Sequence, residues 1–223
     1  THAVTKGLDP SVPMKESGVE WLGEIPAHWE LRRGRFLYSQ RAALPCADDG
    51  VVTAFRDGQV TLRSNRRTDG YTFAEKEVGY QRVYAGDLVV HSMDAFAGAI
   101  GVSESTGKCS PEYQVLTPRC PDTSNHYYSA LLRLMALRGY VYVICPSVRE
   151  RAPRFRYETF KDVWLPVPPP HEQHAAIEHV NRLSPALSRT VSVLKRQLEH
   201  VREYRQALIT AAVTGKLEIP PEE

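Results

Sequence analysis

The chain has 223 residues, of which 42% are hydrophobic and 24% charged, and its formal net charge is only +2. This balance is ordinary for a globular protein and excludes a histone-like protein, so any contact with nucleic acid must come from local patches. The apolar runs are far shorter than the ~20 residues of a membrane span, and no signal-peptide pattern opens the chain. We therefore expect a cytoplasmic protein without a membrane partner. The four cysteines, at positions 46, 109, 120 and 145, are spaced too widely for a metal clip or a disulfide scaffold.

Residues 14–168 predict one compact α+β domain built on a mixed sheet. Asp57-Gly58 lies between two β-rich segments, 51–55 and 59–62, and this arrangement is typical of a hairpin. Further strands are expected at residues 81–84, 87–91, 99–102 and 113–116, separated by glycines. The main helix is expected at residues 125–138, with capping candidates at 122–125 before it and Gly139 after it.

Four prolines between residues 166 and 170 indicate the end of this domain. Residues 169–217 predict a helical coiled-coil arm, followed by a tail at 218–223. Ser184-Pro185 either starts a second helix or places a proline inside a single one. Apolar residues recur at steps of three, four and seven, which is typical of a coiled-coil interface. This seam consists of Leu187, Val191, Leu194, Leu198, Val201 and Leu208.

The alternative for residues 169–217 is an amphipathic helix packed on its own domain. We favour an arm because of the length of the part that follows Ser184-Pro185. Its roughly 28 residues, at a helical rise of ~1.5 Å per residue, give ~42 Å, which is more than a compact domain face usually requires.

The first eight residues resemble a segment close to the other end of the chain. Thr1–Leu8 and Thr210–Leu217 share Thr, Ala, Val, Thr and Leu at matching positions. If the second copy ends a helical arm, residues 1–13 are the tail of an upstream helical region and its linker. We then expect the chain to be the downstream half of a protein built as domain, arm, domain, arm. The alternative is a chance similarity.

The sequence contains no convincing catalytic motif. The histidines of His171-Glu172-Gln173-His174 are three residues apart, whereas a zincin helix needs four, so a polar helix start is the better interpretation. A phosphate loop, a nucleophile elbow and a dinucleotide-binding glycine motif are all missing from the sequence. We expect no catalytic residue, no metal and no cofactor in this chain, which disfavours a standalone nuclease or methyltransferase.

Basic residues concentrate in two segments. Residues 31–70 contain eight arginines against four aspartates, and residues 149–161 contain five basic side chains against two glutamates. The planar guanidinium suits phosphate and the O6/N7 edge of guanine, which favours DNA recognition over solvated or ion-paired arginines. The candidate DNA contacts are Arg56, Arg63, Ser64, Asn65, Arg66, Arg67, Arg149, Arg151 and Arg154.

Several motifs resemble one known family, the specificity subunit of type I restriction-modification systems. Met14–Glu30 resembles the start of its target recognition domain, and Pro166–Gln173 resembles the end of that domain. Gly86–Val90 and Ser110–Tyr113 resemble internal landmarks, while Tyr204–Gly215 resembles the end of the helical arm. The chain looks like the second half of such a subunit.

The resemblance implies a non-catalytic subunit that reads one half of a bipartite site in double-stranded DNA. The helical arm would set the half-site spacing, dock two modification subunits and permit self-association. S-adenosylmethionine would belong to the modification subunits, and a separate restriction subunit would cut. The resemblance carries over no DNA-contacting residue. The alternative function is a coiled-coil adaptor that binds other proteins without DNA.

Overall fold

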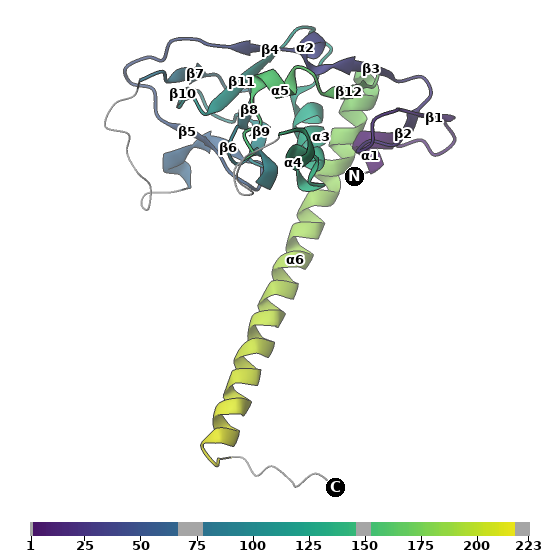
Figure 1. Ribbon diagram of the computed structural model, residues 1–223. Coiled ribbons are helices and arrows are strands. Elements are labelled where there is room, and N and C mark those ends of the chain that lie inside the picture. Colours follow the sequence, from purple (N-terminus) through teal and green to yellow (C-terminus); the bar gives the residue numbers. More distant parts are fainter. Residues whose placement is uncertain (1, 67–77, 146–152, 217–223) are drawn as a thin grey trace. The chain divides into compact units, whose positions relative to one another are not determined.

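The computed structural model describes residues 2–66, 78–145 and 153–216. The chain divides into two compact units, Thr1–Ile177 and Glu178–Glu223. The first is a globular unit that holds every described strand and the short helices, and the second holds most of the long helix α6, Pro170–Val213 (Figure 1). The globular unit thus extends beyond Pro168 and includes the first turns of α6.

The largest sheet of the globular unit has four antiparallel strands in the order β4-β11-β8-β9. These strands are β4 Tyr38–Arg41, β11 Tyr113–Pro118, β8 Leu88–His91 and β9 Ile100–Val102. In the central pair, Tyr113 of β11 lies opposite His91 of β8, and Leu116 lies opposite Leu88. This register places the carboxyl end of β8 beside the start of β11, where the candidate site lies.

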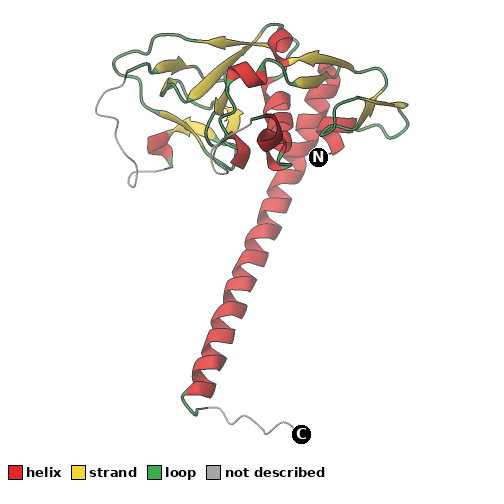
Figure 2. Ribbon diagram, in the orientation of Figure 1, coloured by secondary structure: helices red, strands yellow, loops and turns green. Residues whose placement is uncertain are grey.

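Four two-stranded antiparallel pairs complete the described sheets (Figure 2). They are β1 Met14–Glu16 with β2 Glu24–Pro26, β3 Glu30–Arg33 with β12 Trp164–Val167, β5 Val52–Ala54 with β6 Val60–Leu62, and β7 Gln81–Val83 with β10 Gly107–Cys109. The β5–β6 pair is the predicted hairpin. The α+β class, the six predicted strands and the predicted main helix are all confirmed.

The main helix, α3, spans Asn125–Leu137 and supplies much of the core. The Ser124 hydroxyl accepts a hydrogen bond from the Tyr127 backbone N–H at 3.3 Å, and Gly139, with φ of +82°, follows the helix. Large side chains on one face are fully buried, each worth about 1.5–3 kcal/mol for its apolar surface. They are Tyr127, Tyr128, Leu131, Leu132 and Met135.

The remaining helices of the globular unit are short. They are α1 His2–Lys6, α2 Gly34–Leu37, α4 Tyr140–Ile144 and α5 Tyr157–Phe160, with two 3₁₀ turns, η1 Arg63–Asn65 and η2 Ala95–Ala97. Helix α1 is packed into the unit, because Val4 is buried and its carbonyl accepts a hydrogen bond from the Tyr127 hydroxyl at 2.7 Å. That residues 1–13 end an upstream arm stays a prediction.

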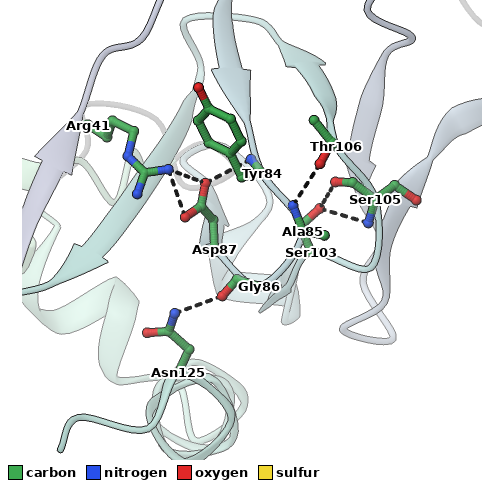
Figure 3. Close-up of polar contacts among 9 residues, drawn as sticks. All are labelled: Arg41, Tyr84, Ala85, Gly86, Asp87, Ser103, Ser105, Thr106 and Asn125. Carbon is green, nitrogen blue, oxygen red and sulfur yellow. Dashed lines mark hydrogen bonds and ion pairs between the residues drawn. The ribbon is translucent and has the colours of Figure 1, made fainter. Parts of the chain in front are cut away.

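The Gly86–Val90 motif forms a turn that joins β4, β8 and α3 (Figure 3). The Asp87 carboxylate accepts the Tyr84 backbone N–H at 2.8 Å and both its oxygens lie within 3.0 Å of Arg41 Nη1. Asn125 Nδ2 donates to the Gly86 carbonyl at 2.8 Å. Burial raises the pKa of Asp87, although Tyr84 and Arg41 oppose the rise. The motif therefore has a structural role in this chain.

The beginning and the end of the predicted recognition domain contact each other. Strands β3 and β12 pair, and Trp29 Nε1 donates to Glu172 Oε2 at 2.8 Å, with His28 Nε2 2.6 Å from Glu172 Oε1. The Gln173 amide accepts the Ser124 backbone N–H and donates to the Pro168 carbonyl. The His171–His174 cluster is thus the polar start of α6, as the sequence predicts.

Residues 170–213 form a single helix that contains Pro185, so the interpretation with a second helix starting at Ser184-Pro185 is wrong. The six seam residues all lie on α6 and are exposed, from 38% at Leu208 to 63% at Val201. Their role in a coiled coil stays a prediction. Among the described helices, none is both long and apolar enough to cross a membrane.

Candidate nucleic-acid interface

The β5–β6 hairpin carries the first candidate contacts. Val52, Ala54 and Val60 are buried in a small core that also contains Val89 and Val115 of the main sheet. The turn between the strands is closed by two backbone hydrogen bonds, from Phe55 N–H to the Gln59 carbonyl and from Gly58 N–H to the Phe55 carbonyl. This packing presents the exposed side chain of Arg56 on a fixed turn.

A half-buried arginine of α3 also contacts this turn. Arg133 Nε donates to the Gly98 carbonyl at 3.1 Å, and Arg133 Nη2 lies 3.4 Å from the Arg56 carbonyl. Burial lowers the pKa of Arg133 from its usual value. A Cβ on Gly58 would collide with the Arg133 guanidinium, and one on Gly101 would collide with the Gly58 carbonyl. Glycine at both positions lets the turn lie directly on β9 and α3.

The arginines of this hairpin form ion pairs. Arg56 Nη2 lies 2.8 Å from Asp94 Oδ1, and Arg66 Nη1 lies 2.7 Å from Asp57 Oδ2. The Arg66 guanidinium also stacks over the Phe55 ring at 4.2 Å from its centroid. Together these five residues line a shallow open depression with Thr53 and Ala54.

The second basic segment reaches the same surface through the main sheet. The Ser92 backbone N–H donates to the Glu112 carbonyl at 2.8 Å, and the Phe155 N–H donates to the Ser92 carbonyl at 3.0 Å. Arg154, next to Phe155, places Nη1 3.3 Å from Glu112 Oε1. The β8–β11 register therefore brings together two arginine-bearing segments that are far apart in the sequence.

His91 lies between the two groups of ion pairs. Its Nδ1 is 3.1 Å from Asp94 Oδ2, and its ring is tilted against the Tyr113 ring at a centroid distance of 4.5 Å. Burial lowers the pKa of His91, whereas the charges of Asp94 and Glu112 act in the opposite direction. We call the set of charged residues around it the arginine–carboxylate surface. It consists of Arg56, Asp57, Arg66, Asp94, Glu112 and Arg154.

The structure places the other candidate contacts as follows. Arg63 Nε lies 3.3 Å from Thr53 Oγ1, and Asn65 Nδ2 donates to Thr61 Oγ1 at 2.9 Å, so both contact the hairpin itself. Ser64 is exposed on η1 between them. Three predicted contacts, Arg67, Arg149 and Arg151, lie outside the described residues. The DNA-contact role of all nine stays a prediction.

No family model and no curated protein sequence matches this chain. Among solved structures, it is similar to a chain from a study of complex assembly and conformational transition of the type I restriction-modification system, with a TM-score of 0.54 and 14% identity over 84% of this chain. The chain therefore shares its fold with that neighbour. It spans about half of that neighbour, 46% of its length. The resemblance predicted from the motifs is confirmed at the level of the fold.

Two specificity subunits are further structural neighbours. One is the HsdS subunit from Thermoanaerobacter tengcongensis, with a TM-score of 0.49, 16% identity and coverage of 92% of this chain and 48% of that one. The other is the type I S subunit from M. genitalium, with a TM-score of 0.46, 12% identity and coverage of 82% and 45%.

Sequence reasoning missed the acidic half of the surface. The two basic segments have a local positive excess, yet the described arginines of the surface are balanced by three carboxylates. Asp94 and Glu112 lie in neither segment, and only strand register brings them there. Glu112 lies in the Ser110–Tyr113 motif, but no local pattern shows that it or Asp94 pairs with an arginine. In the described residues, no group of three or more His, Cys, Asp or Glu side chains is able to hold a metal ion.

Proposed function

We propose that this chain is a non-catalytic specificity subunit that reads one half of a bipartite site in double-stranded DNA. One observation carries the proposal: two separate arginine-bearing segments lie near His91, in a domain that shares its fold with a chain from a type I restriction-modification study. The first segment includes the β5–β6 hairpin, and the second is hydrogen-bonded to Ser92 just after β8. Base recognition requires such anchoring, because phosphate contacts fix the register in which base edges are read.

In the proposed complex, Arg56, Arg66 and Arg154 contact phosphates or guanine edges, and Ser64 faces the bases from η1. Arg67, Arg149 and Arg151 extend the same basic segments. Arg63 and Asn65 reach DNA only if their hydrogen bonds to Thr53 and Thr61 break. We therefore expect their DNA contacts to contribute less to the binding free energy than those of the other residues. The major groove is the expected target, because only there does each base pair present a distinct pattern.

We further propose that α6 docks two modification subunits, which hold S-adenosylmethionine, while a separate restriction subunit cuts the DNA. The exposed seam on α6 supports a docking or pairing role, because a row of exposed apolar residues at heptad spacing is typical of helices that pack against another helix. The same row would set the distance between half-sites. Such a complex acts in the cytoplasm, where it meets DNA.

One observation favours the alternative of a protein-interaction adaptor: Arg56, Arg66 and Arg154 are each already paired with a carboxylate, whereas the seam on α6 is apolar and exposed. An adaptor would associate through α6 with no dependence on DNA.

The experiment is a selection of duplexes from a randomised pool by the full chain, with and without a modification subunit, at two salt concentrations. The proposal predicts enrichment of one short sequence, strongest when the modification subunit is present and at the lower salt concentration. Binding of the modification subunit without enrichment of any sequence would contradict the proposal and favour the adaptor.

A further inference from the structure

Every described arginine of the arginine–carboxylate surface faces a carboxylate. Arg66 is paired within the hairpin by Asp57, Arg56 by Asp94 after β8, and Arg154 by Glu112 before β11. The three carboxylates come from three different segments, so the pairing depends on the tertiary fold and does not follow from neighbouring residues in the sequence. These oxygens occupy the position that phosphate oxygens take when arginine binds DNA.

The ion pairs are exchangeable. The side chain of Arg56 is 68% exposed and that of Arg154 is 45% exposed, so water and salt screen both pairs. A phosphate of DNA therefore competes with the carboxylate for the same guanidinium. After the exchange, the carboxylate is left as an unpaired negative charge close to the DNA backbone, which opposes binding.

We propose that Asp57, Asp94 and Glu112 are specificity-determining residues that suppress binding to DNA of arbitrary sequence. This inference rests on the DNA binding proposed above. On arbitrary DNA, the phosphate contacts of the arginines are offset by the loss of the ion pair and by the repulsion of the carboxylate. On the right half-site, the released carboxylate accepts a hydrogen bond from a base amino group, as carboxylates do from N4 of cytosine, and the penalty is removed.

Asp94 is the most informative of the three residues. Its two oxygens contact two different partners, Arg56 at 2.8 Å and His91 at 3.1 Å, at the point where the two arginine-bearing segments meet. Asn has the same shape and keeps one acceptor oxygen, so Asp94→Asn removes the negative charge with little change in packing. Glu112→Gln is the equivalent change beside Arg154.

A matched control lies beside the same hairpin. Glu104 is exposed and accepts a hydrogen bond from Gln59 Nε2 at 2.9 Å, and it has no arginine partner in the described residues. Glu104→Gln removes one negative charge from the same neighbourhood without releasing a guanidinium.

The test measures the affinity of the full chain for a random-sequence duplex at several salt concentrations, with thermal melting to show that each variant is folded. We expect Asp94→Asn and Glu112→Gln each to bind the random duplex about two- to five-fold more tightly. A change of this size corresponds to the free energy of an exposed ion pair. The slope of log affinity against log salt should steepen by about 0.9 for each additional phosphate contact. Glu104→Gln should differ little from the unchanged chain.

Three results would overturn this inference. The carboxylates do not suppress binding if Asp94→Asn and Glu112→Gln bind the random duplex no more tightly than the unchanged chain. Equal tightening by Glu104→Gln would show that net charge alone decides the affinity. If the unchanged chain and all variants bind no DNA at any salt concentration, the proposed function itself fails and this inference fails with it.

Discussion

The ends of the predicted recognition domain and the arginine–carboxylate surface differ in how their polar groups are held. Where the ends meet, Trp29 is 1% exposed and Gln173 is 2% exposed; the Trp29 hydrogen bond to Glu172 is partly buried and the Gln173 bond to the Pro168 carbonyl is buried. On the arginine–carboxylate surface, the pairs are exposed and exchangeable. Most of the motifs that resemble a known family belong to the first region, to the Asp87 turn or to α6, and one of them, Ser110–Tyr113, includes Glu112 of the surface. A resemblance of this kind therefore identifies the scaffold, but it does not show which carboxylate pairs with which arginine.

The largest expected effect concerns the contact between the two ends of the domain. Trp29→Ala removes a buried indole and leaves Glu172 without its 2.8 Å donor, so the free energy of unfolding should fall by about 3–5 kcal/mol. Denaturant unfolding measures the change. Trp164→Ala is the control, because Trp164 is 43% exposed on β12 and should cost much less. Equal losses from the two variants would contradict the difference between the buried and the exposed region.

The second prediction concerns the seam on α6. Leu194→Glu combined with Leu198→Glu places two charges in the proposed helix interface, which should abolish association through the arm, as measured by analytical ultracentrifugation with and without a modification subunit. Val193→Glu adds a charge to the same helix outside the seam and should leave association unchanged. An unaltered association state of the double variant would count against the arm.

The third prediction separates phosphate contacts from stability. Arg56→Ala and Arg66→Ala should each weaken DNA binding and reduce the salt slope by about 1, because each removes one phosphate contact. The free energy of unfolding should change by less than about 0.5 kcal/mol, since both pairs are exposed. Arg32→Ala removes the exposed pair with Glu30 on β3 and should change neither quantity. Unchanged affinity and salt slope in the two hairpin variants would remove the hairpin from the interface.

The smallest expected effect is the pH dependence that His91 produces. Because burial lowers the pKa of His91, the unfolded chain takes up a proton below about pH 6.5 that the folded chain does not bind. The free energy of unfolding should therefore fall as the pH decreases from about 6.5 toward the lower pKa of the folded state. His91→Gln should reduce this dependence. A pH profile unchanged by His91→Gln would contradict the assignment.

The sequence predicts those parts of the fold whose signals are local. The Asp57-Gly58 turn, the apolar run of β8 and the cap of α3 each depend on a few neighbouring residues, and all three predictions are confirmed. The short strands β1 and β2 were missed because they have no apolar alternation, and β3 and β12 because each is stabilised by the other, far away in the chain.

The candidate site could be predicted only in its basic half. Eight arginines in one segment are visible as composition, whereas the pairing of Arg56 with Asp94 and of Arg154 with Glu112 depends on the register of β8 against β11. The support that Arg133 gives to the Arg56 turn has the same origin, since it requires α3 to pack beneath the hairpin. Neither contact has a local sequence signal.

The most direct test of the account is amide hydrogen exchange of the full chain with and without a duplex enriched from the randomised pool. The account predicts that the duplex slows exchange in two segments together, the turn at residues 55–58 and the end of β8 at residues 91–94, while β3 is unaffected. Slower exchange at β3 with no change at these two segments would place DNA elsewhere on the domain and contradict the central claim.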